Sequence, residues 1–323
     1  MDEEAEVEEA EAPKVRSAEV QPSKEEIDEH FVDHAVFRAW CPHCVKGKAV
    51  SFPHHVTQGT GSIPMISIDY MDVSDKQDVA EEKGMPTLVC TVDCSGTSVA
   101  KVVPSRGVQE YAINSLVKFI KRLGYKKVIC ESDNEPAILA LKEAARKELD
   151  VQVVMEESAV GDHQGNGKAE SAIRQVQCQF RAMKDALETR YGRRIDGEHR
   201  CIPWLMMHAA AVINRSRKGT DGLTAYRRSK GRKFNRNVAE FGENAFYLQA
   251  NSAGKNKFDV RWQEGIWLGI RDESGGIVVG TAAGVVKAKD FRRKRDHDER
   301  WNGERFDGFR GLPWEPIPGK GGE

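Results

Sequence analysis

Apolar and polar residues alternate along several short stretches of the chain, while in other stretches apolar residues recur every three or four positions. Alternation predicts β-strands with one buried face, and the spacing of three and four predicts helices with one buried stripe. The pattern predicts strands over residues 64–71, 87–93, 98–103, 128–131 and 151–155. It predicts helices over residues 108–123, 135–149 and 202–214, and a long helix that follows the glycine-rich stretch 161–167.

The order of these elements indicates an α/β fold. Three strands in hairpin-like succession are followed by alternating helices and strands, which predicts a mixed five-stranded sheet with flanking helices over residues 60–195. Residues 196–240 are expected to form a helical, basic linker. Over residues 241–295 short apolar runs are separated by glycine turns, so a small β-barrel is expected there.

Three carboxylates stand at informative places in this pattern. Asp69 lies on the polar face of the first strand, Asp133 follows the fourth strand, and Glu170 lies near the start of the long helix. Two acids at strand ends and one on a flanking helix can converge on one site. Because hard oxygen ligands suit Mg²⁺ or Mn²⁺, the three residues predict a catalytic site for two such ions.

The local motifs around these acids resemble a known family. Asp133 and Glu170 are separated by 170 − 133 = 37 positions, and Asp133 lies in Ser132-Asp133-Asn134-Glu135. The helix entry reads Gln164-Gly165-Asn166-Gly167-Lys168-Ala169-Glu170, in which Gly165 is an added residue. These features resemble the D,D,E core of retroviral and copia-type retrotransposon integrases, over roughly residues 30–295. The resemblance implies a ribonuclease-H-like core that processes DNA 3′ ends and joins them to target DNA.

A set of histidines and cysteines precedes the core. His30 and His34 are four positions apart, and Cys41 and Cys44 form a C-x-x-C pair. Together they supply the four nitrogen and thiolate donors of a structural zinc site, which predicts a zinc-binding helical module over residues 29–56. It resembles the zinc module of integrases but has a shorter gap between the two pairs. His43, His54 and His55 are therefore alternatives to His30, and a metal-free C-x-x-C turn is the other reading.

The net charge of −1 hides a strong asymmetry along the chain. Residues 1–29 hold twelve acids and three bases, whereas residues 174–236 hold sixteen Lys or Arg and five Asp or Glu. A basic body favours a polyanionic partner, here double-stranded DNA contacted through phosphates. The candidate DNA-binding residues are Lys168, Arg174, Arg181, Arg227, Arg228, Arg232, Lys233, Arg292 and Arg293. For Arg174 an ion pair with Glu170, four positions away on the helix, is the alternative.

The two ends of the chain predict little structure. Residues 1–28 are acidic and of low complexity, so a disordered tail is expected, either solubilising or inhibitory by mimicking DNA phosphates. Residues 296–323 are rich in Gly, Pro and charge, and a loose tail is expected.

The function favoured by these patterns is that of a retroelement integrase, active in the nucleus or in cytoplasmic particles. We expect a homo-oligomer with Mg²⁺ or Mn²⁺ at the catalytic acids, and no membrane partner, because no run of apolar residues is long enough to span one. Two alternatives remain open: a catalytically silent DNA-binding scaffold left from an element, and a plain metal-dependent nuclease.

Overall fold

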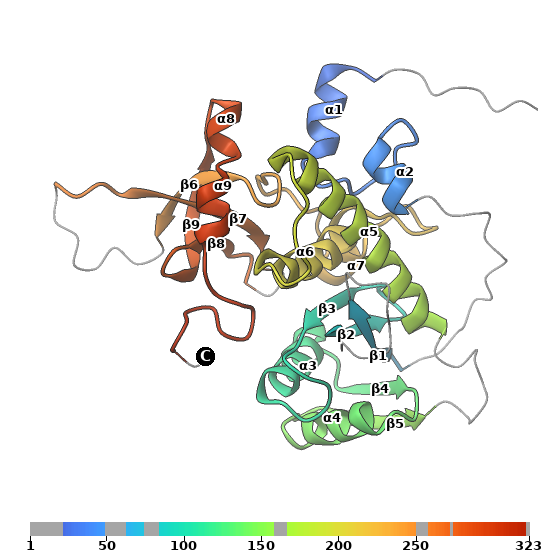
Figure 1. The fold of residues 1–323 in the computed structure, drawn as a ribbon. Coiled ribbons are helices and arrows are strands. Elements are labelled where there is room, and N and C mark those ends of the chain that lie inside the picture. The colour runs from blue at the N-terminus through green and yellow to red at the C-terminus, as the bar shows by residue number, and fades with distance from the viewer. Residues whose placement is uncertain are drawn as a thin grey trace, which may run out of the picture.

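The computed structural model describes residues 22–48, 63–73, 84–157, 167–249, 258–271 and 274–320 (Figure 1). Four features of the sequence lie outside these residues: most of the acidic N-terminal stretch, His54, His55 and nearly all of the glycine-rich stretch 161–167. None of the described helices is both long and apolar enough to cross a membrane.

A mixed five-stranded sheet forms the centre of the first half of the chain. Its order is β3-β2-β1-β4-β5, with β1 antiparallel to β2, β2 antiparallel to β3, and β4 parallel to both β1 and β5. This is the strand order of a ribonuclease-H-like core, so the predicted fold class is confirmed. The strand bounds are Met65–Val73 (β1), Met85–Val92 (β2), Ser98–Val102 (β3), Lys127–Ser132 (β4) and Gln152–Glu157 (β5).

Both faces of the sheet are covered by helices. Ile66, Ile68 and Tyr70 of β1 are buried in one apolar cluster with α3 and α4, whereas Met71 is buried in another with α5 and α6. Because side chains alternate between the faces of a strand, Asp69 shares the face of Met71, toward α5. The helices are Glu110–Leu123 (α3), Pro136–Lys147 (α4), Gly167–Tyr191 (α5) and Cys201–Ser216 (α6).

Two short helices precede the sheet. Helix α1 spans Lys24–Phe31 and begins with a capping box between Ser23 and Glu26, and α2 spans Pro42–Lys48. The structure thus differs from the tail expected over residues 1–28, because local capping starts a helix inside the acidic stretch. Helix α2 packs on α5, and only glycine fits at Gly47, where an added Cβ would lie 2.5 Å from the backbone nitrogen of Ala182.

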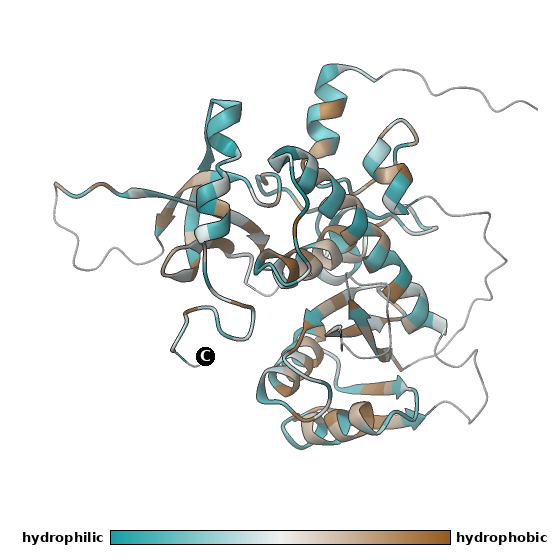
Figure 2. Cartoon of the chain, in the orientation of Figure 1, coloured by the Kyte–Doolittle hydropathy of each residue, from teal (hydrophilic) through white to brown (hydrophobic). Residues whose placement is uncertain are grey.

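The predicted barrel is present after the core. A short helix, Ala225–Lys230 (α7), precedes a closed barrel in which β6 pairs with β7 and β9, and β8 pairs with β7 and β9. Helix α6 lies between the sheet and the barrel and contacts β3 and β7 (Figure 1), and it is largely apolar in Figure 2. The strand bounds are Asn244–Gln249 (β6), Trp262–Ile270 (β7), Ile277–Thr281 (β8) and Gly284–Arg293 (β9).

The C-terminal segment is more ordered than its composition suggests. Two short helices span His297–Arg300 (α8) and Gly303–Gly308 (α9). Phe306 and Phe309 are fully buried in the same cluster as the α5 and α6 side chains. The expectation of a loose tail from residue 296 was wrong over these helices, because two aromatic side chains anchor a segment otherwise rich in Gly and charge.

Candidate active site and metal centres

The structure places Asp69 in the middle of β1 and Asp133 directly after the end of the neighbouring strand β4. In the parallel pairing of β1 with β4, Ile68 lies opposite Ser132, so the residues that follow them, Asp69 and Asp133, continue side by side. Glu170 lies in the first turn of α5, which contacts β1. The three candidate catalytic acids therefore come together beside the middle of β1, where β4 ends, on the side of the sheet that α5 covers.

The pKa of Asp69 reflects its burial and the nearby carboxylates. Its side chain is half-buried, and the Tyr70 backbone N–H donates a hydrogen bond of 2.7 Å to its Oδ1. The pKa of Asp69 is nevertheless raised to about 6, chiefly by burial and in addition by the negative charges of Asp133, Glu135 and Glu170. Asp133 and Glu170 are exposed, so the group opens toward solvent.

Arg106 is a neighbour of the carboxylates that the sequence did not single out. Its guanidinium donates a 2.7 Å hydrogen bond to Glu135, forms a second ion pair with Asp72, and lies over the ring of Tyr70 at 5.4 Å. Arg106 thus compensates two further acids near the site. Among the described residues no cation is paired with Asp69, Asp133 or Glu170, so these three keep their capacity to hold divalent ions.

A buried lysine fixes the strand end that carries Asp133. Lys142 of α4 is only 3 % exposed, and its Nζ donates to the Ser132 hydroxyl at 2.9 Å and to the Glu156 carbonyl at 3.0 Å. The Ser132 hydroxyl donates in turn to the carbonyl of Asp133 at 3.0 Å. Burial lowers the pKa of Lys142. This chain of hydrogen bonds ties β4, β5 and α4 together beside the candidate active site.

The four predicted zinc ligands form a second, separate group. One ligand atom of each of His30, His34, Cys41 and Cys44 lies within 4.8 Å of the others, and all four side chains are buried. The Cys44 sulfur is 3.3 Å from Nε2 of His30, and the Cys41 sulfur is 3.5 Å from Nδ1 of His34. Among the described residues, no other group of three or more His, Cys, Asp or Glu side chains is as compact. The group could hold a zinc ion.

Among the described residues, the geometry also decides between His30 and His43. His43 is paired with Asp185 of α5 and stands outside the four-ligand group, so His30 takes the place that the sequence had left in doubt. Helix α1 ends before His34, which has a left-handed φ of 48°, so the two histidines do not share a helix face. Burial lowers the pKa of His30 to about 4 and that of His34 to about 2, which leaves both rings neutral, as metal ligands are.

The candidate DNA-binding residues fall into two groups. Arg228 pairs with Asp221 and donates to the Ser95 carbonyl at 3.0 Å, and Arg293 pairs with the fully buried Glu243 at 2.8 Å. These two cations are occupied by contacts within the fold. Arg174 is exposed and forms no ion pair with Glu170 in the described part of the chain. The other exposed candidates are Lys168, Arg181, Arg227, Arg232, Lys233 and Arg292.

Lys168 and Arg292 already make weak contacts within the fold. Lys168 lies 3.8 Å from Asp93, and the Arg292 guanidinium lies 5.7 Å over the ring of Trp262. Both side chains remain exposed. A surface contact of this kind contributes little to stability, so neither side chain is committed to its partner.

Comparisons with known proteins give solved structures only, since no family model and no curated protein matches the chain. The catalytic core domain of BIV integrase is 21% identical, with a TM-score of 0.35, covering 51% of this chain and 92% of that one. A chain of the simian T-cell lymphotropic virus intasome in complex with PP2A regulatory subunit B56 gamma is 13% identical. It also has a TM-score of 0.35, covering 73% of this chain and 84% of that one. The strand order and register described above are by themselves those of an integrase-like, ribonuclease-H-like core.

Proposed function

We propose that this chain is a retroelement integrase, a polynucleotidyl transferase that trims DNA 3′ ends and joins them to target DNA. The observation that carries the proposal is that Asp69, Asp133 and Glu170 come together beside β1: burial raises the pKa of Asp69, and the negative charges of the other two acids add to that rise. Like charges held together without a cation are costly, and a pair of divalent cations relieves that cost.

The residues present fit such a pair of ions. Asp69, Asp133 and Glu170 would hold these ions through their carboxylate oxygens. The ions would supply charge neutralisation for the attacking oxygen and for the leaving oxygen. Because the pKa of Asp69 is about 6, this carboxylate is mostly ionised at neutral pH and ready to bind.

The proposed reaction exchanges one phosphodiester bond for another. In trimming, a water oxygen forms the new bond to phosphorus and the bond to the 3′ oxygen breaks, which leaves a 3′-hydroxyl. In joining, that hydroxyl oxygen attacks a target phosphorus and displaces a target 3′ oxygen, which takes up a proton. Arg174 and Lys168 are exposed on the helix that carries Glu170, and in this proposal they would hold the phosphates of the donor end.

The remaining parts of the proposal concern partners. The exposed cations are suited to phosphate contacts without base reading, so we propose double-stranded DNA as the partner and a homo-oligomer in the nucleus as the working form. The His30, His34, Cys41 and Cys44 group is proposed to hold structural zinc, since all four ligands come from the protein and are buried.

The experiment is a joining assay with duplex oligonucleotides that carry the element's own ends, with Mg²⁺ or Mn²⁺ added. The proposal expects products shorter than the donor strand, followed by products longer than it, and neither from Asp133→Asn. Shortened products alone would indicate a nuclease. DNA binding without either product in both metals would indicate a scaffold.

A further inference from the structure

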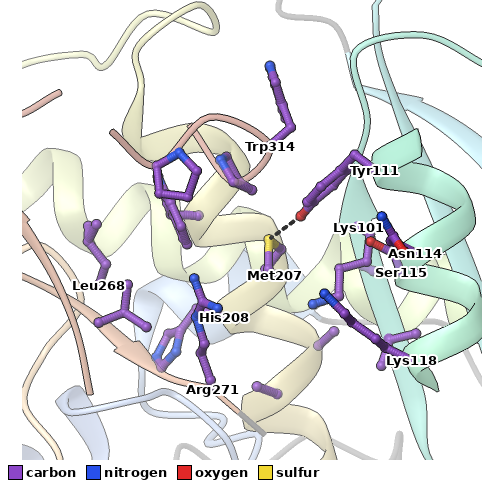
Figure 3. Close-up of a pocket in the computed structure, with 18 of the residues that line it drawn as sticks. Lys101, Tyr111, Asn114, Ser115, Lys118, Met207, His208, Leu268, Arg271 and Trp314 are labelled. Atoms are coloured by element: carbon purple, nitrogen blue, oxygen red, sulfur yellow. Dashed lines mark hydrogen bonds between the residues drawn. The ribbon is translucent and has the colours of Figure 1, made fainter. Parts of the chain in front are cut away.

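A cavity of about 530 Å³ lies on the far side of β3 from the other strands, between α3, α6, the barrel and the segment 313–316 (Figure 3). Its volume falls in the range of about 300–1,000 Å³ that is usual for small-molecule sites. None of its lining residues belongs to the carboxylate group or to the histidine–cysteine group. The cavity is therefore a separate feature that the proposed reaction does not use.

The charge of the lining is strongly positive. Four cations line the cavity, Lys101, Lys118, Arg271 and Lys287, against the single carboxylate of Glu110. They come from separate parts of the fold, and within the described residues Lys118 and Lys287 have no ion-pair partner. Such a convergence of cations favours an anionic ligand with more than one charged oxygen.

His208 adds no positive charge to this lining. It is buried, and burial lowers its pKa to about 3, so the imidazole is neutral at physiological pH. Its ring packs edge-on against Trp267 and beside Phe241, with centroids 5.2 and 5.5 Å away. The attraction for an anion therefore comes from the lysines and Arg271.

One face of α3 supplies aromatic and polar groups together. Tyr111, Asn114, Ser115 and Lys118 all line the cavity and follow the helical spacing of three and four. Figure 3 shows them on the α3 side, with Trp314 and Met207 opposite the tyrosine. This face offers a flat ring, hydrogen-bonding amide and hydroxyl groups, and a cation within two helical turns.

The wall opposite α3 contains Trp314 and Met207, and both contact Tyr111 of α3. The rings of Trp314 and Tyr111 meet edge to face with centroids 6.4 Å apart, and the Tyr111 hydroxyl lies 4.0 Å from the Met207 sulfur. The indole N–H of Trp204 donates to the Gly311 carbonyl at 3.1 Å, which anchors the segment leading to Trp314. Two aromatic rings in the lining of a cationic cavity suit a flat, heteroaromatic group.

We propose that this cavity binds a nucleotide, with the base against Tyr111 and Trp314 and the phosphates toward Lys118, Lys287 and Arg271. A free nucleotide and a terminal nucleotide of a single strand share this chemistry. A duplex is too wide for a site of this volume. The site extends the nucleic-acid chemistry of the proposed function but does not depend on the carboxylates.

The test measures binding of two probes to the full chain without added divalent metal, so that the carboxylate group cannot hold phosphates through an ion. The probes are deoxyadenosine triphosphate and a short, 5′-phosphorylated single strand. Lys118→Glu should weaken binding about tenfold. Lys121→Glu is the matched control on the same helix, also exposed but outside the cavity, and should bind as the wild type does. Trp314→Ala tests the aromatic wall and should also weaken binding.

The outcomes separate the sources of the ligand and the two proposals. Binding of only the triphosphate identifies a free nucleotide, binding of only the strand identifies a strand end, and either supports the site. Asp69→Asn with Glu170→Gln should leave binding unchanged, even though it removes the proposed catalysis. The proposal is overturned if neither probe binds, if Lys121→Glu weakens binding as much as Lys118→Glu, or if a glutamate-rich peptide binds more tightly than both probes.

Discussion

The two candidate metal sites of this chain differ in almost every physical respect. The histidine–cysteine group is closed: its ligand atoms lie within 4.8 Å of one another, and all four side chains are buried. The carboxylate group is open: Asp133 and Glu170 are exposed, Asp69 is half-buried, and the three acids do not form so compact a set. Structural zinc sites are closed in this way, whereas catalytic sites keep positions for water and substrate.

The same difference appears in what holds each group together. The closed site depends on α2, which is docked on α5 through Gly47 and through the pairing of His43 with Asp185. The open site depends on a rigid sheet, whose strand ends are tied by Lys142 and Ser132. The comparison indicates that contacts around the first site stabilise the fold. At the second site, burial and neighbouring carboxylates disfavour the ionised form of Asp69.

The largest expected effect is at the closed site. Cys41→Ser combined with Cys44→Ser removes both thiolates, so zinc should fall from about one per chain to none, and the α1–α2 module should lose its fold. Metal analysis and thermal unfolding measure both changes. Cys178→Ser, a half-buried cysteine on α5 outside the group, is the control and should keep its metal. A wild-type protein that is folded and free of zinc would contradict the structural role.

A smaller effect tests the contact between the module and α5. Gly47→Ala places a methyl group against the backbone of Ala182, at 2.5 Å from its nitrogen, so the free energy of unfolding should fall by about 1–3 kcal/mol. Chemical denaturation measures this change. Gly308→Ala, where an added methyl meets nothing within 4 Å, should leave stability nearly unchanged. Equal stability of the two variants would mean that the module is not held against α5 as described.

At the open site, the raised pKa of Asp69 should make the free energy of unfolding depend on pH. The pKa of Asp69 is raised in the folded state from 3.8 to about 6, so its contribution to stability is fully present below pH 3.8 and is lost as pH rises through 6. Without divalent metal, Asp69→Asn should therefore be more stable than wild type at pH 7.5. We expect about 1 kcal/mol, after discounting the shift for solvent screening.

The same titration governs metal binding at this site. Because a carboxylate must be ionised to hold the ions, Mn²⁺ affinity should fall as pH drops through 6. Calorimetric titration measures it, and the stability gain of Asp69→Asn should vanish below about pH 4. Asp150→Asn, at a carboxylate 97% exposed, is the control for both measurements and should change neither. If wild type were more stable than Asp69→Asn at pH 7.5 without metal, the ionised Asp69 carboxylate would not destabilise the fold.

The smallest effect concerns how DNA reaches the open site. Arg227 and Arg228 are adjacent on α7, but Arg227 is exposed while Arg228 is engaged by Asp221 and the Ser95 carbonyl. Arg227→Ala should lower the slope of log affinity against log salt by about 0.9, the loss of one phosphate contact. Arg228→Ala should lower stability and leave the slope unchanged. The reverse result would assign the phosphate contact to Arg228.

Much of the core could be predicted because its signals are local. The alternation of Ile66, Ile68 and Tyr70 with polar residues follows from a sheet buried on one side against α3 and α4, and the stripe of α5 follows from packing on the other. The four residues of the histidine–cysteine group could be predicted from residue type and spacing alone. Their geometry could not, since His34 lies beyond the end of α1.

Other features depend on contacts between distant parts of the chain. Arg106 acquires its role only when the fold brings Glu135 and Asp72 to it, and Lys142 only when α4 crosses the ends of β4 and β5. No motif surrounds either residue. The count of cations over residues 174–236 also overstated the free positive surface, because Arg190 and Arg228 are paired with Glu240 and Asp221 within the fold.

The most direct test of the central claim is whether Asp69, Asp133 and Glu170 act as one unit in cleavage and joining. Asp69→Asn, Asp133→Asn and Glu170→Gln should each abolish both activities with DNA binding and zinc content unchanged, and each double variant should be no worse than its singles, because members of a unit lose function together. Asp93→Asn, a carboxylate outside the group, should stay active. Partial losses that multiply in the double variants, or an active Glu170→Gln, would show that the three carboxylates are independent surface acids.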